Sequence, residues 1–115
     1  NSANSYLIMA YNSKLNYCTA SPDSLFGVRF NYACYLHDRQ YRNEVKFRKT
    51  RKQADIDFRN KIYEIFYNNT KPLNIGVKIN NPILIKSISP ILGFLVSRIY
   101  FKGVFYFAGS AYVRS

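Results

Sequence analysis

The sequence predicts a small, mainly α-helical domain with two antiparallel core helices. Its 115 residues match one small domain in length, and 48% of them are hydrophobic, which is enough for a core. In two central stretches, side chains recur at spacings of three and four residues, the period of one helix face. The sequence shows no internal repeat, so we expect residues 1–115 to form a single domain.

The N-terminal half predicts a short helix, a loop and a longer helix. Residues 3–11 suit the short helix. Residues 12–29 are rich in Asn, Ser, Pro and Gly, and the letters SPDS within them signal a turn. The longer helix is expected over residues 31–48. One stripe of this helix carries Cys34, His37, Asp38, Tyr41 and Val45.

A second long helix is expected over residues 53–67, and it carries an acid on its apolar face. Asp55 shares that face with Phe58, Ile62 and Phe66. A lone carboxylate is costly to bury, so Asp55 needs a polar partner from another element.

The C-terminal part predicts a loop and a third helix. Residues 68–82 are loop-like, and the chain from residue 83 is strongly apolar. Three cations, Pro90 and Gly93 interrupt this stretch, which leaves no clean run of about 18 apolar residues to span a membrane. We expect a helix over residues 90–107, packed on the other two, with surplus apolar surface for lipid or a protein partner.

The net charge of +11 favours a polyanionic partner: nucleic acid, anionic lipid or an acidic protein surface. Residues 46–52, KFRKTRK, hold five cations in seven positions. They suit a solvated helix end and loop better than a phosphate-contacting patch. Aromatic residues make up 17% of the chain and suit both single-stranded nucleic acid and a membrane interface.

The two cysteines, Cys18 and Cys34, allow two interpretations. In a cytosolic protein they would be unpaired thiols, whereas in a secreted protein they would form a single bridge.

The only histidine of the chain lies on the first long helix. Across an antiparallel helix pair, His37 would face Asp55, the arrangement of a general base with an orienting carboxylate. Tyr41 lies one turn further on, placed to hydrogen-bond Asp55. Asp38 is about 100° away from His37 around the helix and points toward the 16–28 loop. There it would bind Ca²⁺ together with backbone carbonyls, or simply pair with Arg42.

These residues resemble a known family, the secreted phospholipases A2, and most closely the small bacterial and fungal type. His37-Asp38-x-x-Tyr41 matches the His-Asp-x-x-Tyr signature, and Asp55-x-x-Phe58 resembles the Asp-x-x-Phe of the second long helix. Residues 18–43 resemble the calcium loop, the disulfide and the catalytic helix of that type, in order. The shared elements are Cys18, Pro22-Asp23, Phe26-Gly27, Phe30-Asn31, Ala33-Cys34, His37-Asp38 and Tyr41-Arg42-Asn43.

The resemblance implies a secreted enzyme that uses Ca²⁺ to hydrolyse the sn-2 ester of glycerophospholipids at a membrane surface, with anionic lipid favoured. His37 would activate water, Asp55 would orient the imidazole and Tyr41 would brace Asp55. Ca²⁺ would be bound by Asp38, the backbone carbonyl of Tyr17 and Asn16, and Cys18 would be bridged to Cys34. The acyl slot would be lined by Leu25, Phe26, Phe30 and part of the C-terminal segment.

The chain also departs from the family. Asn16 stands where these enzymes usually carry an Asp, so one negative charge at the metal is lost, and the bacterial members' second disulfide is missing. The C-terminal third is more apolar and basic than the family predicts. An inactive phospholipase A2-like subunit or toxin component, with a protein partner at that segment, is the alternative. A nucleic-acid-binding module ranks last, because it leaves the cluster of Cys, His and Asp residues unexplained.

Overall fold

Three α-helices account for more than half of the residues that the structure describes. The computed structural model describes residues 11–18 and 21–112. The helices are α2, Asn31–Tyr41, α3, Arg51–Tyr67, and α4, Pro82–Phe107, and a short 3₁₀ turn, η1, follows at Gly109–Ala111. The mainly α-helical class is therefore confirmed. The short helix expected over residues 3–11 lies, apart from Tyr11, outside the described residues.

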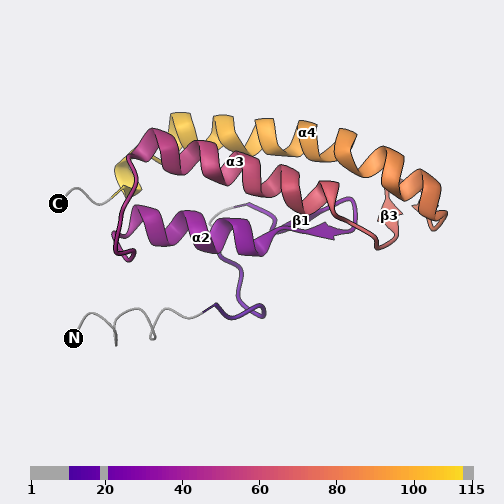
Figure 1. Ribbon diagram of the computed structural model, residues 1–115, viewed down its shortest axis with the longest axis horizontal. Helices are drawn as coiled ribbons and strands as arrows, with labels where there is room; N and C mark the ends of the chain where they lie inside the picture. Colours follow the sequence, from indigo (N-terminus) through magenta and orange to yellow (C-terminus); the bar gives the residue numbers. More distant parts are fainter. Residues whose placement is uncertain (1–10, 19–20, 113–115) are drawn as a thin grey trace.

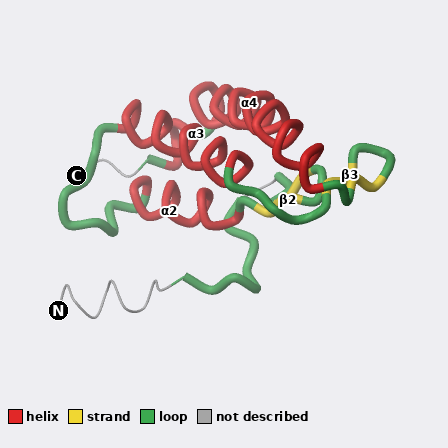
Figure 2. The backbone as a smooth tube through the Cα atoms, turned by 45° about the vertical axis from the view of Figure 1, so that its right-hand side comes forward, coloured by secondary structure: helices red, strands yellow, loops and turns green. Residues whose placement is uncertain are grey.

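The middle helix, α3, packs against α2 on one side and α4 on the other (Figures 1 and 2). The C-terminal end of α2 meets the start of α3, where Arg51 donates a hydrogen bond to the Tyr41 hydroxyl. The same Arg51 contacts carbonyls near the end of α4. Both neighbours thus run antiparallel to α3, and the expected antiparallel pair is confirmed.

The first long helix ends earlier than its side-chain pattern predicts. It was expected to reach residue 48, but α2 stops at Tyr41. Asn43 adopts a left-handed conformation with φ 59°, which Asn tolerates better than most residues. The N–H of Glu44 then donates to the Arg39 carbonyl and that of Asn43 to the Gln40 carbonyl, the paired bonds of a Schellman cap. Val45 therefore lies outside the helix.

The other two helices begin earlier than predicted, and each begins at a side-chain cap. The Thr50 hydroxyl accepts a hydrogen bond from the N–H of Gln53, so α3 starts at Arg51 rather than residue 53. The Asn81 side chain accepts from two backbone N–H groups and Pro82 occupies the first turn, so α4 starts there and not near residue 90. Pro90 lies inside α4 without ending it.

Because α4 starts earlier than predicted, it is longer and gains apolar residues. With 26 residues, α4 is long and apolar enough to cross a membrane by length and composition alone, contrary to the sequence expectation. Only 28% of its most apolar window is buried in the protein. One stripe of α4 packs on α3, and the rest of the helix is accessible.

Two short hairpins replace the loops expected before α2 and α4. Strands β1, Ser24–Leu25, and β2, Val28–Arg29, pair antiparallel, as do β3, Leu73–Asn74, and β4, Lys78–Ile79. Positive φ angles at Phe26 and Gly27 make the first turn, and the N–H of Asn74 donates to the Phe26 carbonyl and so joins the hairpins. Both hairpins lie at the N-terminal end of α2 and α4, away from the C-terminus (Figure 1).

Helices α3 and α4 approach each other closely at Gly93. A Cβ atom at this position would overlap the Cβ of Phe66, which is itself fully buried. We expect Gly93→Ala to lower the free energy of unfolding by about 1–3 kcal/mol, because neither backbone can move aside freely.

Gly103→Ala is the matched control for that substitution. Gly103 also lies within α4, and nothing stands within 4 Å of an added Cβ there. Its replacement should raise stability by up to about 1 kcal/mol through helix propensity. Urea denaturation of both variants measures the difference. Equal stability changes would contradict the close approach of the two helices at Gly93.

Candidate functional site

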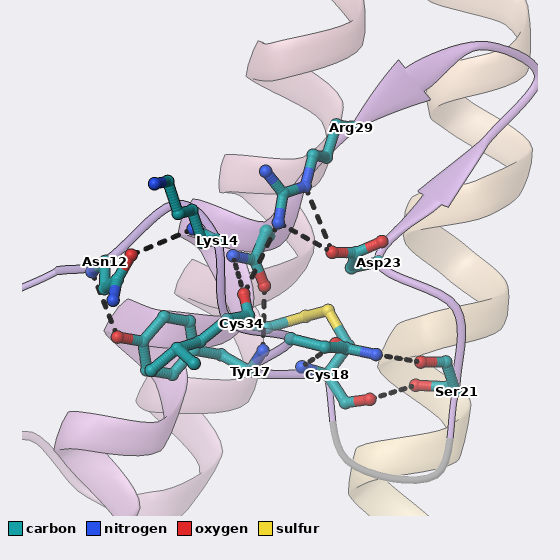
Figure 3. A network of polar contacts seen from close by, with 11 residues as sticks. Asn12, Lys14, Tyr17, Cys18, Ser21, Asp23, Arg29 and Cys34 are labelled. Atoms are coloured by element: carbon teal, nitrogen blue, oxygen red, sulfur yellow. Dashed lines mark hydrogen bonds and ion pairs between the residues drawn. A yellow bond between two sulfur atoms is a disulfide. The ribbon is translucent and has the colours of Figure 1, made fainter.

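The segment before α2 is tied to that helix by one disulfide and one buried amide. Cys18 and Cys34 are bridged, with their Cα atoms 5.1 Å apart, as the resemblance implied (Figure 3). The Asn31 side chain accepts from the N–H of Tyr17 at 2.8 Å and donates to the Leu15 carbonyl at 2.6 Å. Residues 15–18 are thereby held against the start of α2.

The lone histidine meets the buried aspartate of the next helix. Nε2 of His37 lies 2.8 Å from Oδ1 of Asp55, and the Tyr41 hydroxyl donates to the same oxygen at 2.5 Å. Asp55 is fully buried. The spatial arrangement expected for these three residues is thus present. Because Asp55 accepts at Nε2, it favours the imidazole tautomer with its proton there and leaves Nδ1 as the basic nitrogen.

Arg51 joins this group from one turn before Asp55, and the sequence analysis missed it. Its Nε lies 3.2 Å from the Tyr41 hydroxyl and 3.8 Å from Oδ2 of Asp55. Its guanidinium also donates to the Val104 and Phe105 carbonyls of α4. The i, i+4 spacing to Asp55 was the signal available in the sequence. Arg51 therefore balances the buried carboxylate and fixes the end of α4 beside it.

The pKa of the Tyr41 hydroxyl is raised well above its ordinary value. Burial, together with the hydrogen bond to Asp55, raises its pKa to about 12. The unfolded chain releases this proton near its ordinary pKa of about 10. The folded chain holds the proton more tightly, so this stabilising contribution is complete below about pH 10 and is lost as pH rises toward 12.

We therefore expect Tyr41→Phe to flatten the alkaline stability profile. Wild-type protein should lose about 1.4 kcal/mol more of its free energy of unfolding between pH 9 and pH 11 than the variant does. Tyr106→Phe is the control, because the Tyr106 side chain is exposed. Urea denaturation at the two pH values gives both differences. The same slope in wild type and Tyr41→Phe would contradict the environment described for this hydroxyl.

His37 opens onto a cavity of about 150 Å³ on the side of Asp38. The N-terminal segment lines it with Tyr17, Cys18 and Ser21. The C-terminal segment lines it with Tyr100, Val104, Ala108 and Ala111. The contribution of the C-terminal segment was expected. Tyr100 is fixed there by a hydrogen bond from its hydroxyl to the Pro22 carbonyl at 2.7 Å.

Of the three residues predicted to bind metal, two lie at the cavity and the third does not. Asp38 and Tyr17 line the cavity beside His37, and the Asp38 carboxylate also lies 3.2 Å from Nε of Arg42, the alternative pairing. Asn16 is engaged within its own loop. Its Oδ1 accepts from the N–H of Cys18 at 2.8 Å, and its Nδ2 donates to the Ser21 carbonyl.

The apolar residues proposed for an acyl slot lie elsewhere. Phe30 is fully buried in the core, where its ring contacts those of Phe66 and Tyr100. Leu25 and Phe26 lie in the first hairpin and do not line the cavity beside His37. None of the three lines the cavity, because Phe30 is buried in the core, Leu25 packs against that core and Phe26 lies in the turn of the hairpin.

Comparison of the chain with protein-family models, with curated proteins and with solved structures finds no significant match.

Proposed function

We propose that the protein is a Ca²⁺-dependent phospholipase A2 that hydrolyses the sn-2 ester of glycerophospholipids to fatty acid and lysophospholipid. One observation carries the proposal: His37 is hydrogen-bonded to the buried Asp55 and borders a cavity that Asp38 and Tyr17 also line. This arrangement joins a general base to oxygen ligands in one place. It agrees with the sequence resemblance to the secreted enzymes.

The residues of the chain divide the chemistry between them. Nδ1 of His37 accepts a proton from the attacking water, and the imidazolium formed is stabilised by Asp55 through Nε2. Tyr41 and Arg51 keep the Asp55 carboxylate in place. The apolar side chains of Val104, Ala108 and Ala111 exclude bulk water from the cavity. The proton then returns to the leaving alcohol.

The oxygen groups at the cavity fit a hard cation such as Ca²⁺. Asp38 supplies a carboxylate, and the Tyr17 carbonyl accepts no hydrogen bond from any described residue. The Arg42 side chain paired with Asp38 is more than half exposed, and such pairs are weak, so it is displaced easily. Asn16 would have to leave its hydrogen bond to Cys18 to reach a metal, so we assign the ligand role to Asp38 and Tyr17. Ca²⁺ held by Asp38 and Tyr17 would polarise the ester carbonyl and stabilise negative charge on its oxygen.

The proposal includes that the enzyme is secreted and that it favours anionic lipid surfaces. A disulfide at Cys18–Cys34 suits an oxidising compartment, and it restrains the segment that carries Tyr17. The net charge of +11 attracts anionic headgroups at up to about 1 kcal/mol for each cation near the surface.

The test of the reaction type is regiospecificity. Vesicles of a phospholipid with different acyl chains at sn-1 and sn-2 are incubated with the protein and millimolar Ca²⁺, and the released fatty acids are separated. We expect the sn-2 chain alone. Release of the sn-1 chain, or of both chains equally, would contradict the proposed reaction.

A second candidate is an inactive phospholipase A2-like subunit that binds another protein. The observation in its favour is Asn16, whose neutral amide is committed to its own loop instead of a metal. In that case no fatty acid is released at any Ca²⁺ concentration, although the protein is folded.

A further inference from the structure

An apolar ridge runs along one side of α4 and is open to solvent. It consists of Leu95, Ile99 and Tyr106, with Phe107 beside them at the last position of the helix, and we call these four residues the α4 ridge. Their exposed fractions are 52%, 66%, 70% and 85%. The first three lie at i, i+4 and i+11, which places them on the same side of the helix. Large apolar side chains gathered in this way mark a surface that meets an apolar partner.

The ridge leads into the candidate site. Ile99 and Phe107 line a cavity of about 590 Å³ together with Gly103. This cavity shares Tyr100 and Val104 with the cavity that contains His37 and Asp38. Whatever covers the ridge therefore lies at the entrance to the catalytic group.

The charges of α4 identify the kind of partner. Lys86, Arg98 and Lys102 lie on this helix, and α4 contains no acidic residue. The guanidinium of Arg98 stacks over the Phe94 ring at 4.6 Å, beside the apolar surface. A second copy docked α4 to α4 would bring these cations together without a counter-charge. An anionic bilayer offers both apolar chains and negative headgroups.

The packing of α4 favours a helix that lies on the bilayer over one that crosses it. Ser89 and Ser97 are fully buried on the inner stripe, and Gly93 approaches the backbone of α3 closely. A lipid environment all around the helix would require this contact to break. With the contact kept, only the outer side and the ridge can meet lipid.

We propose that the α4 ridge docks on an anionic phospholipid bilayer and brings the mouth of the His37 cavity to the lipid surface. The choice of phospholipid rests on the proposed function, because a phospholipase must reach such a surface. The docking itself requires no turnover, so binding and hydrolysis can be measured separately.

The chain contains no tryptophan, so the fluorescence of a single inserted tryptophan reports on the surroundings of that one position. Ile99→Trp tests the ridge, and Val77→Trp, on the turn between β3 and β4, is the control with an equal exposed fraction of 66%. Both are made in a His37→Gln background with EDTA. Vesicles of equal parts phosphatidylglycerol and phosphatidylcholine are added. We expect the tryptophan emission to shift to the blue and to be quenched by brominated lipid for Ile99→Trp only. No response at 99, or the same response at 77, would overturn the proposal.

Affinity supplies the second measurement. Ile99→Ser should weaken binding to the same vesicles about tenfold, whereas Val77→Ser should leave it unchanged. Sedimentation with vesicles gives both values, and circular dichroism verifies that each variant is folded. The Ile99→Trp emission could instead be blue-shifted without vesicles, and the protein could elute as a dimer on size-exclusion chromatography. That result would overturn lipid docking and identify a second copy of the chain as the partner of the ridge. Vesicle binding without hydrolysis in the unmodified protein would overturn the proposed function and leave the docking surface standing.

Discussion

Replacing His37 by Gln should remove turnover and leave the fold intact. The substitution takes away the only imidazole of the chain and with it the basic nitrogen at the cavity. General acid–base catalysis contributes about 10²-fold to 10⁴-fold in rate, so the loss should be at least of that order. Release of fatty acid from phospholipid vesicles measures it.

The geometry explains why this variant should still fold. The amide of the introduced glutamine can donate to Asp55 in place of Nε2, so the buried carboxylate keeps a partner. The ring contacts of His37 with Tyr41 and Phe58 are lost, at centroid distances of 4.1 and 4.6 Å, which should cost a modest part of the stability. Circular dichroism and urea denaturation verify the fold. A folded His37→Gln protein with wild-type turnover would rule out the general base.

Replacing Asp38 by Asn should weaken Ca²⁺ binding strongly. Asp38 is the only carboxylate among the described residues that line the cavity shared by His37 and Tyr17. Wild-type affinity is expected near the weak end for extracellular sites, with a Kd of about 10⁻⁴ to 10⁻³ M, because Asn16 adds no charge. Loss of the remaining carboxylate should move binding beyond the measurable range of isothermal calorimetry.

Asp57→Asn is the matched control for the metal site. Asp57 is also a partly exposed carboxylate paired with a cation, Lys49, but it lines a different cavity, which does not include Asp38 or Tyr17. Its replacement should leave Ca²⁺ affinity unchanged. Equal loss of affinity in both variants would indicate nonspecific attraction of the ion, and unchanged affinity in Asp38→Asn would exclude Asp38 as a ligand.

The contact of His37, Tyr41 and Asp55 was predictable because each of the two helices that carry them has a regular side-chain pattern. Helical spacing places His37 and Tyr41 one turn apart, and Asp55 is conspicuous as a carboxylate on an apolar face. A buried carboxylate requires a partner, and an antiparallel pair of helices brings these residues together. The structure shows all three in contact.

The rest depended on contacts between distant parts of the chain. Arg51 reaches the Val104 carbonyl across 53 positions, and Tyr100 reaches the Pro22 carbonyl across 78, distances over which periodicity carries no information. The end of α2 depends on a left-handed Asn43, and the start of α4 on the Asn81 cap. Both are single-residue signals. The side-chain pattern of residues 31–48 outweighed the first, and the interruption expected at Pro90 outweighed the second.

The most direct test of the proposed enzyme is fatty-acid release from anionic phospholipid vesicles, titrated against free Ca²⁺. The proposal predicts release that rises with Ca²⁺ and saturates, stops when EDTA is added and returns when Ca²⁺ is restored. No release by folded protein at millimolar Ca²⁺, or release that EDTA does not change, would contradict a Ca²⁺-dependent phospholipase A2.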